Sequence, residues 1–179
     1  MVGLRLFLTA AVLLAIVAVG RAEPPTALPA LAFQDQEGHT LELATLRGQV
    51  VVIVYGTRAG LEHHAEWGQR LHNALIGHGL YRAEDRPEQR PVRILALAQM
   101  GGIPHAFRPV IRTFVRGHIP AGFSLYLDWE DRLSGLFGAH RSLSTVVVGD
   151  REGGVRMVTT GLPRDAALRA IVEMIRRLA

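Results

Sequence analysis

Blocks of apolar residues along the chain predict a series of strands. Val50 to Tyr55 is a continuous, largely β-branched run, and Val92 to Ala98 is a second one. Such runs are typical of strands that are covered on both faces, as in the interior of a partly parallel sheet. Weaker patterns around Phe33 and at Thr40 to Leu43 predict two short strands joined by a turn at Asp35 to Gly38.

Helical spacing of apolar positions indicates three longer helices and a short one. Apolar residues recur every three or four positions from Leu61 to His78 and from Arg164 to Leu178. Pro104 can begin a helix that runs to Arg116, and Glu130 to Phe137 predicts the short helix. We expect the large aromatic side chains in and beside these segments to pack against the sheet: Trp67, Phe107, Phe114 and Trp129.

The order of these elements predicts the fold class. A strand at Phe123 to Leu127 is followed by a hairpin, in which Ser144 to Val148 and Val155 to Thr159 flank a glycine-rich turn. Alternating strands and helices followed by an antiparallel pair predict an α/β fold, with a mixed central sheet flanked by helices and an N-terminal β-hairpin extension. We expect residues 31–179 to form this single domain.

The first part of the chain has a different pattern. A basic residue precedes an apolar run from Leu6 to Val19, and small residues follow that run. This pattern predicts a signal peptide over residues 1–22 with cleavage after Ala22, and therefore a periplasmic or secreted location in a bacterial cell envelope. The run is short for a bilayer span of roughly 20 residues, although an uncleaved anchor is an alternative. Residues 23–30 are proline-rich and predict an extended lead-in.

The composition of the chain excludes several kinds of active site and partner. None of the 179 residues is cysteine, so the chain has no thiol for disulfide or peroxide chemistry, even in an oxidising compartment. Every basic residue is arginine, which excludes a lysine nucleophile. A net charge of +4 is too small for a nucleic-acid footprint, and we expect no cofactor. Membrane contact is expected only if the N-terminal segment stays uncleaved.

Several motifs resemble the thioredoxin-like superfamily. These are F-x-D-x-x-G from Phe33 to Gly38, VVVIVYG from Val50 to Gly56, and STVVVGDREG from Ser144 to Gly153. Their order is similar to that in the redoxin branch, which includes TlpA-type thiol reductases, peroxiredoxins and Sco-type copper chaperones. The resemblance covers about residues 33–160 and implies a thioredoxin-like fold.

The redox residues that this resemblance implies are missing. Ala59 and Glu62 stand where a C-x-x-C motif would lie. A register one residue later would suit the Sco-type C-x-x-x-C motif and place its second cysteine at His64. The residues just before Thr145, 141–144, include no proline, whereas the superfamily has a cis-proline at this place. We therefore expect an ordinary trans loop there. The chain is interpreted as a degenerate, cysteine-free member of the superfamily.

Two functions remain open at this point. The first is a redox-inactive domain, not an enzyme, that binds another envelope protein or an extended peptide. The resemblance implies that the surface around the turn and the proline loop would hold this partner, with Arg58, Leu61, His64, Trp129, Leu143 and Ser144. The alternative is a transition-metal carrier similar to Sco-type chaperones, with ligands His64, His140 and Glu62.

Two further interpretations concern charged residues. Arg58 can bind an anion beside a helix N-terminus, but an ion pair with Glu62 one turn later is the simpler interpretation. Asp128 and Asp131 come at the end of a strand and the start of the short helix, where capping roles are expected for acidic side chains.

Overall fold

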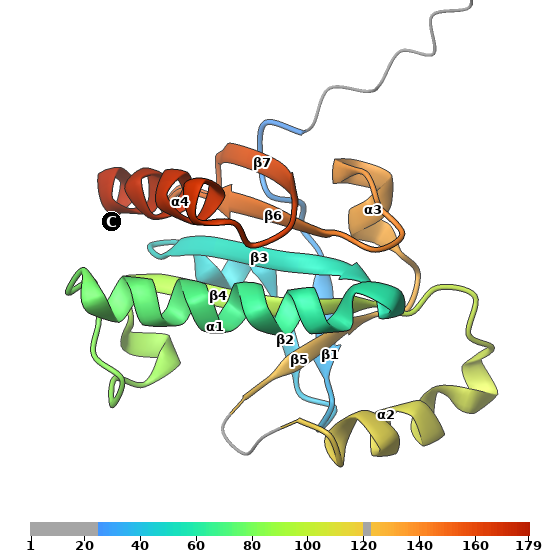
Figure 1. Ribbon diagram of the computed structural model, residues 1–179. Helices are drawn as coiled ribbons and strands as arrows, with labels where there is room; N and C mark the ends of the chain where they lie inside the picture. The colour runs from blue at the N-terminus through green and yellow to red at the C-terminus, as the bar shows by residue number, and fades with distance from the viewer. Residues whose placement is uncertain (1–24, 120–122) are drawn as a thin grey trace, which may run out of the picture.

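The computed structural model describes residues 25–119 and 123–179 (Figure 1). The predicted signal peptide, residues 1–22, lies outside the described residues, and so does the side chain of Leu61. In the part of the chain that is described, no helix is long and apolar enough to span a bilayer.

The described strands form one mixed sheet of seven strands in the order β2-β1-β5-β4-β3-β6-β7. Neighbours β3, β4 and β5 are parallel, whereas β6 and β1 pair antiparallel with β3 and β5. The hairpins β1–β2 and β6–β7 add the outer strands. This topology confirms the predicted mixed sheet and N-terminal hairpin. The bounds are Ala32–Asp35 for β1, Thr40–Glu42 for β2, Val50–Thr57 for β3, Val92–Gln99 for β4, Leu125–Asp128 for β5, Ser144–Gly149 for β6 and Val155–Gly161 for β7.

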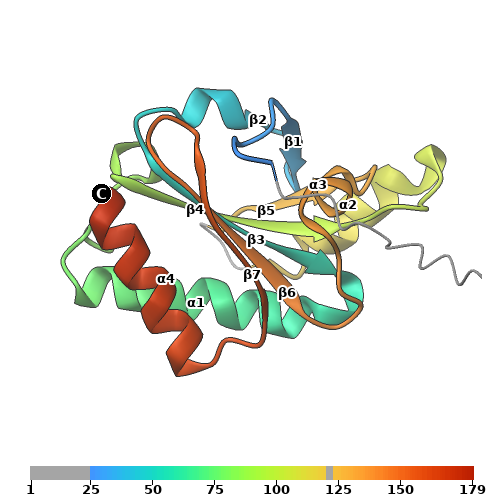
Figure 2. The same cartoon turned by 90° about the horizontal axis from the view of Figure 1, so that it is seen from above.

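Helices cover both faces of this sheet. α1 and α4 lie side by side on one face, as Figure 2 shows from above, and α3 packs on the opposite face with the 3-10 turn η1. The α-helices are α1 (Leu61–Gly77), α2 (Arg108–Arg116), α3 (Arg132–Phe137) and α4 (Asp165–Leu178). The 3-10 turns are η1 (Leu43–Leu46), η2 (Arg58–Gly60), η3 (Pro87–Gln89) and η4 (His105–Phe107).

The core follows the alternation of side chains along the central strands. Val50, Val52 and Val54 of β3 face α1 and α4, and contact a cluster that includes Trp67, Leu71, Leu75, Ile171 and Ile175. The intervening residues of β3 face the other way and pack with a second cluster, which includes Phe33, Leu43, Leu97, Leu133 and Phe137. Both faces of β3 are therefore buried, as its continuous apolar sequence predicts.

The structure corrects the predicted boundaries at three elements. The segment after Pro104 forms the 3-10 turn η4 before α2 begins at Arg108. The strand predicted from Phe123 begins two residues later, as β5. The short helix begins at Arg132 because Asp131 has a positive φ of 50°, which a right-handed helix does not accommodate.

The prediction that Phe107 and Phe114 pack against the sheet is wrong. Their side chains are 59% and 63% exposed. The reason is the rotation of α2, which turns Ile111 and Val115 toward a buried cluster around β5. Trp67 and Trp129, by contrast, are buried as predicted.

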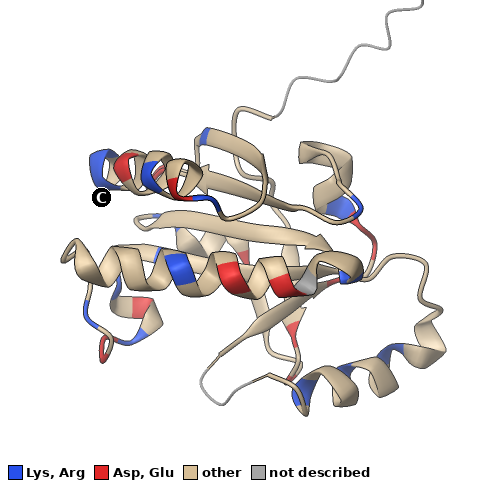
Figure 3. Cartoon of the chain, viewed as in Figure 1, with Lys and Arg blue, Asp and Glu red and all other residues tan. Residues whose placement is uncertain are grey.

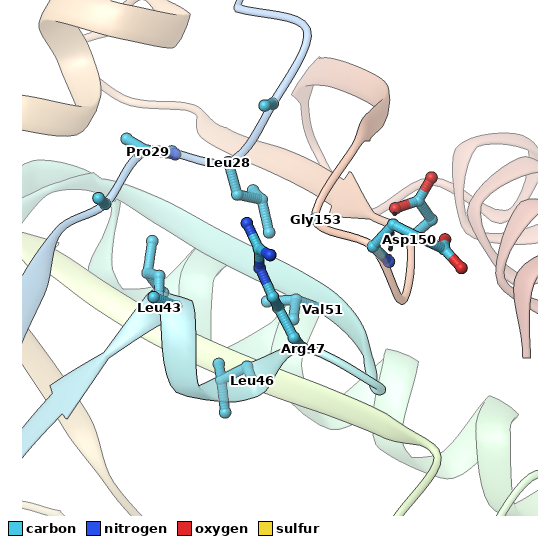
Figure 4. A pocket seen from close by; sticks show the side chains of 12 residues that line it. Leu28, Pro29, Leu43, Leu46, Arg47, Val51, Asp150 and Gly153 are labelled. Carbon is cyan, nitrogen blue, oxygen red and sulfur yellow. Dashed lines mark hydrogen bonds between the residues drawn. The ribbon is translucent and has the colours of Figure 1, made fainter.

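The described part of the lead-in is tied to the β6–β7 turn. The Leu28 amide donates to the Gly153 carbonyl at 2.7 Å, and the Val155 amide donates to the Thr26 carbonyl at 2.8 Å. A small pocket lies beneath this segment, and the side chains of Leu28 and Arg47 extend into it (Figure 4). Since the pocket lies at Val51, near the start of β3, it is at the opposite end of this strand from the predicted site.

Candidate functional site

The predicted site lies where β3 passes through η2 into α1. The loop that precedes β6 faces this turn and is fixed to β3 by two hydrogen bonds. The Tyr55 hydroxyl donates to the Gly138 carbonyl at 2.5 Å, and the Thr57 hydroxyl donates to the Arg141 carbonyl at 2.5 Å. No cis peptide bond occurs in the residues that the structure describes, which confirms the expected trans loop before Thr145.

His64 fills the space between the turn and this loop. The side chain is only 2% exposed and comes from the first turn of α1. A Cβ atom added to Gly56 would lie 2.2 Å from His64 Nε2 and 3.1 Å from the Leu143 carbonyl oxygen. The imidazole therefore occupies space that is open only because residue 56 is glycine.

The buried imidazole of His64 is uncharged at neutral pH. Burial, and secondarily the neighbouring His63, lowers the pKa of His64 from 6.5 to about 4. Neither ring nitrogen has a hydrogen-bond partner among the described residues. Because a charged imidazole without a partner is strongly disfavoured in the interior, His64 acts here as a packing group.

The structure shows how the positions of the two possible cysteine registers lie at the turn. A Cβ atom added to Gly60 would lie 3.2 Å from His64 Nε2. Ala59 and Glu62, the positions predicted by the C-x-x-C register, are both exposed to solvent. Residues 60 and 64, the two positions of the later C-x-x-x-C register, therefore face each other across the turn.

The structure separates the six predicted binding residues into two groups. Arg58 is exposed and Leu143 is half-buried, so both are accessible beside the turn. His64, Trp129 and Ser144 are buried, which corrects their placement on an exposed surface. Trp129 packs with Met100 and Leu127 in the cluster that α2 covers. The sixth residue is Leu61, whose side chain lies outside the described part.

Sequence reasoning missed part of the accessible surface. Arg141 and Ser142 are exposed, and their loop faces η2 across Gly60. The absence of a proline before Thr145 marks this loop but does not show which side chains it presents. Arg58 forms no ion pair with Glu62 among the pairs found in the described residues, so the simpler interpretation of this arginine is not supported.

The alternative ligand set does not come together. Within residues 25–119 and 123–179, no group of three or more His, Cys, Asp or Glu side chains could hold a metal ion. His64 is buried, Glu62 is exposed, and the exposed His140 uses Nδ1 to accept a hydrogen bond from the Ser142 amide at 3.3 Å.

A second set of polar residues lies at the carboxyl ends of the parallel strands. Gln99 of β4 is in register with Asp128 of β5, and both side chains are buried. Asp128 accepts a hydrogen bond from the Leu133 amide at 3.0 Å, which confirms that it caps α3. Asp131 instead accepts from the Gly101 amide at 2.8 Å and caps nothing with its side chain.

Tyr55 connects this polar set to the loop of the candidate site. Burial raises the pKa of Tyr55 to about 12, and the nearby Asp128 carboxylate contributes in the same direction. The phenol therefore stays protonated and donates to Gly138 across the whole physiological range. These groups hold the strand ends and the loop in place, which is a structural role.

Comparison with known proteins identifies the fold. No family model matches the sequence, and no curated protein matches it either. Among solved structures, an exposed lipoprotein thioredoxin of Streptococcus pneumoniae is 15% identical, with a TM-score of 0.57 over 83% of this chain and 98% of its own. A SCO1/SenC family lipoprotein of Bacillus anthracis is 13% identical, with a TM-score of 0.57 over 89% and 99%.

A third similar structure is the thioredoxin domain of a thiol-disulfide oxidoreductase of Bacteroides vulgatus. It is 14% identical, with a TM-score of 0.54 over 87% of this chain and 99% of its own. All three similarities cover more than four fifths of this chain and nearly all of the solved chain. The chain is thus a cysteine-free protein with the thioredoxin-like fold, as the motifs in its sequence predict.

Proposed function

We propose that this protein is a redox-inactive thioredoxin-like domain of the bacterial cell envelope, and that it works by binding an extended segment of another protein. The observation that carries the proposal is the site itself. A hydrogen bond from Thr57 to the Arg141 carbonyl fixes the loop to the end of β3. The imidazole of His64 fills the space between the turn and this loop. This geometry supports a binding role for a site that carries no reactive sulfur.

Envelope location is supported by two observations of different kinds. The sequence from Leu6 to Ala22 has the pattern of an export signal. Two of the similar solved proteins are described as lipoproteins, although their identity to this chain is only 15% and 13%.

Redox inactivity is supported by the composition. Without cysteine the chain has no sulfur nucleophile that could exchange with a disulfide or reduce a hydroperoxide. The purified protein should reduce insulin and consume hydrogen peroxide no faster than buffer does. Turnover above that background would contradict the proposal.

The accessible residues indicate the chemistry of the partner. Arg58 and Arg141 are exposed on the two sides of the site, with half-buried Leu143 beside them. Guanidinium groups around an apolar side chain suit an extended peptide that carries carboxylates next to an apolar residue. An acidic, partly apolar segment of an envelope protein is therefore the expected partner.

The binding surface can be tested by substitution. We expect Arg58→Glu and Leu143→Asp each to reduce capture of envelope proteins by the immobilised domain at least tenfold. Arg82→Glu is the matched control, because Arg82 is exposed on a loop beyond the far end of α1. The proposal fails for this surface if both site variants capture the same proteins in the same amounts as Arg82→Glu.

A further inference from the structure

The small pocket at the start of β3 is enclosed by three segments that are far apart in the sequence. Its walls are the lead-in at residues 27–30, η1 with the following Arg47, and the β6–β7 turn, and Val51 of β3 also lines it. Its volume is about 100 Å³. Because a water molecule takes up about 30 Å³ in the liquid, this space holds a few non-hydrogen atoms of a ligand.

Hydrogen bonds join the walls of the pocket to one another. The Leu43 amide donates to the Leu31 carbonyl at 2.9 Å, which ties η1 to the lead-in. The Gly48 amide donates to the Arg151 carbonyl at 2.8 Å, which ties the end of η1 to the β6–β7 turn. The lead-in is in turn bonded to this turn, as described above. The pocket is therefore formed before a ligand enters, which lowers the entropy cost of binding.

The inner surface of the pocket is apolar. Leu43, Leu46 and Val51 are only 3%, 7% and 2% exposed, and the side chain of Leu28 points toward them from the lead-in (Figure 4). Figure 3 shows no charged position along β3. The inner part of the pocket therefore suits a short hydrocarbon chain better than a polar group.

Arg47 brings a positive charge to this apolar space. Its side chain extends into the pocket from the end of η1 (Figure 4), and the residue is exposed, so solvent reaches the guanidinium. The ion pairs and hydrogen bonds found among the described residues do not involve the Arg47 side chain. A guanidinium with free donors suits the two oxygens of a carboxylate.

The two acidic residues that line the pocket do not neutralise Arg47. The buried carboxylate of Asp150 is used within the β6–β7 turn, where it accepts from the Glu152 amide at 3.0 Å and from the Gly154 amide at 2.6 Å. It also forms an ion pair with Arg156. Glu152 is exposed at the rim and forms no ion pair with Arg47 among the described residues. Its charge opposes an anion in the pocket, which gives a test of the sign.

We propose that this pocket binds a small aliphatic carboxylate of about three to five carbon atoms. The hydrocarbon chain contacts Leu43, Leu46 and Val51, and the carboxylate oxygens accept hydrogen bonds from the Arg47 guanidinium. An inorganic anion such as phosphate leaves the apolar wall unused, and an aliphatic amine places its charge against that of Arg47. The pocket is at the other end of β3 from the protein-binding site proposed above, so the two proposals are independent.

Sodium butyrate is the probe for this site. Titrated into the ¹⁵N-labelled protein at constant ionic strength, it should shift the amide signals of Ala30, Ala44 and Gly153, with a dissociation constant of about 1 mM. Arg47→Gln should weaken binding at least tenfold, because it removes the charged donors. Glu152→Gln should instead strengthen binding by up to about threefold, because it removes a negative charge at the rim.

Other compounds and a matched variant separate this site from unspecific effects. Butylamine has the same chain and the opposite charge, and should not shift these amides. Octanoate should bind more weakly than butyrate, because its chain exceeds the pocket. Arg82→Gln, on the exposed loop after α1, should bind butyrate as the wild type does.

Four results would overturn the proposal. Butyrate may not fail to shift the three amides, and butylamine must not shift them equally. Equal butyrate affinity of Arg47→Gln and the wild type would exclude the guanidinium as the partner of the carboxylate. An affinity that rises steadily up to octanoate would indicate unspecific apolar binding in place of a pocket of limited size.

Discussion

Gly56 and His64 form the contact on which the shape of the candidate site depends. A methyl group at position 56 would lie 2.2 Å from His64 Nε2 and also close to the Leu143 carbonyl. Sequence patterns predict the strand that contains Gly56 and the helix that contains His64. They do not predict this contact, because the rotation of α1 against β3 decides which helix residue faces the glycine.

Replacing Gly56 tests this contact directly. Gly56→Ala should lower the free energy of unfolding by about 1–3 kcal/mol, since the new methyl group overlaps a buried ring. The loss should be much smaller when His64→Ala is already present, because the two changes act on one contact. Urea unfolding of the wild type, the two single variants and the double variant completes a double-mutant cycle. The cycle measures the coupling free energy between positions 56 and 64.

A glycine in the following helix provides the control for that cycle. A Cβ atom added to Gly68, within α1, meets nothing within 4 Å. Gly68→Ala should therefore leave stability unchanged or raise it by up to about 1 kcal/mol. If Gly56→Ala behaves in the same way, the packing described for His64 is wrong.

His64 also makes stability depend on pH. Its pKa is lowered to about 4 in the folded protein, against 6.5 for an ordinary histidine, so the unfolded chain binds the proton more tightly. The contribution of His64 to the free energy of unfolding is therefore fully present above pH 6.5 and is lost as the pH falls toward 4. Between pH 7 and pH 5 the wild type should lose about 2 kcal/mol more than His64→Gln.

The comparison with His64→Gln isolates this one residue. His72 also has a lowered pKa, through burial and the nearby Arg90, but it is present in both proteins and its effect cancels. Urea unfolding at several pH values gives, for each protein, the slope of the unfolding free energy against pH. Parallel slopes would show that His64 is solvated rather than buried.

At the scale of elements, α2 shows what an apolar pattern can and cannot predict. The pattern from Pro104 to Arg116 correctly predicts helical structure. It contains apolar residues on more than one side, and the sequence does not show which side meets the sheet. Only the short extent of β5 and the packing of Ile111 and Val115 against it determine that the phenylalanines face outward.

Two neighbouring positions test this orientation. Val115→Ser should destabilise the protein by about 1–3 kcal/mol, because Val115 packs against the buried cluster around β5. Phe114→Ser should change stability by less than about 0.5 kcal/mol, because its side chain is 63% exposed. Thermal unfolding of the two variants distinguishes them. The opposite ranking would mean that α2 is rotated.

At the scale of the whole molecule, the order of apolar runs predicts the mixed α/β sheet, whereas the thioredoxin-like fold is predicted by the resemblance of the motifs. β3 and β4 read as interior strands because both of their faces are covered, and the terminal helix α4 begins within a residue of its predicted start. The accessible surface of the site was predicted less well, since His64 and Ser144 are buried by neighbours that are remote in sequence.

The lead-in links the first described residues to the β6–β7 turn, and Leu28 carries this link. Its side chain packs against Gly149, where an added Cβ would lie 2.6 Å from Leu28 Cδ1. Leu28→Ala should lower the free energy of unfolding by about 1–3 kcal/mol. Glu152→Ala, an exposed change on the rim of the same pocket, should be neutral. Equal effects in urea unfolding would show that the lead-in is not part of the fold.

The contact between positions 56 and 64 has an evolutionary consequence. A larger residue at position 56 is tolerated only when residue 64 becomes smaller, so the two positions cannot change independently. Orthologues should therefore pair an alanine or serine at the strand position with a compact residue in place of the imidazole. A cysteine pair at positions 60 and 64 would require replacement of both Gly60 and His64, so no single substitution can supply it.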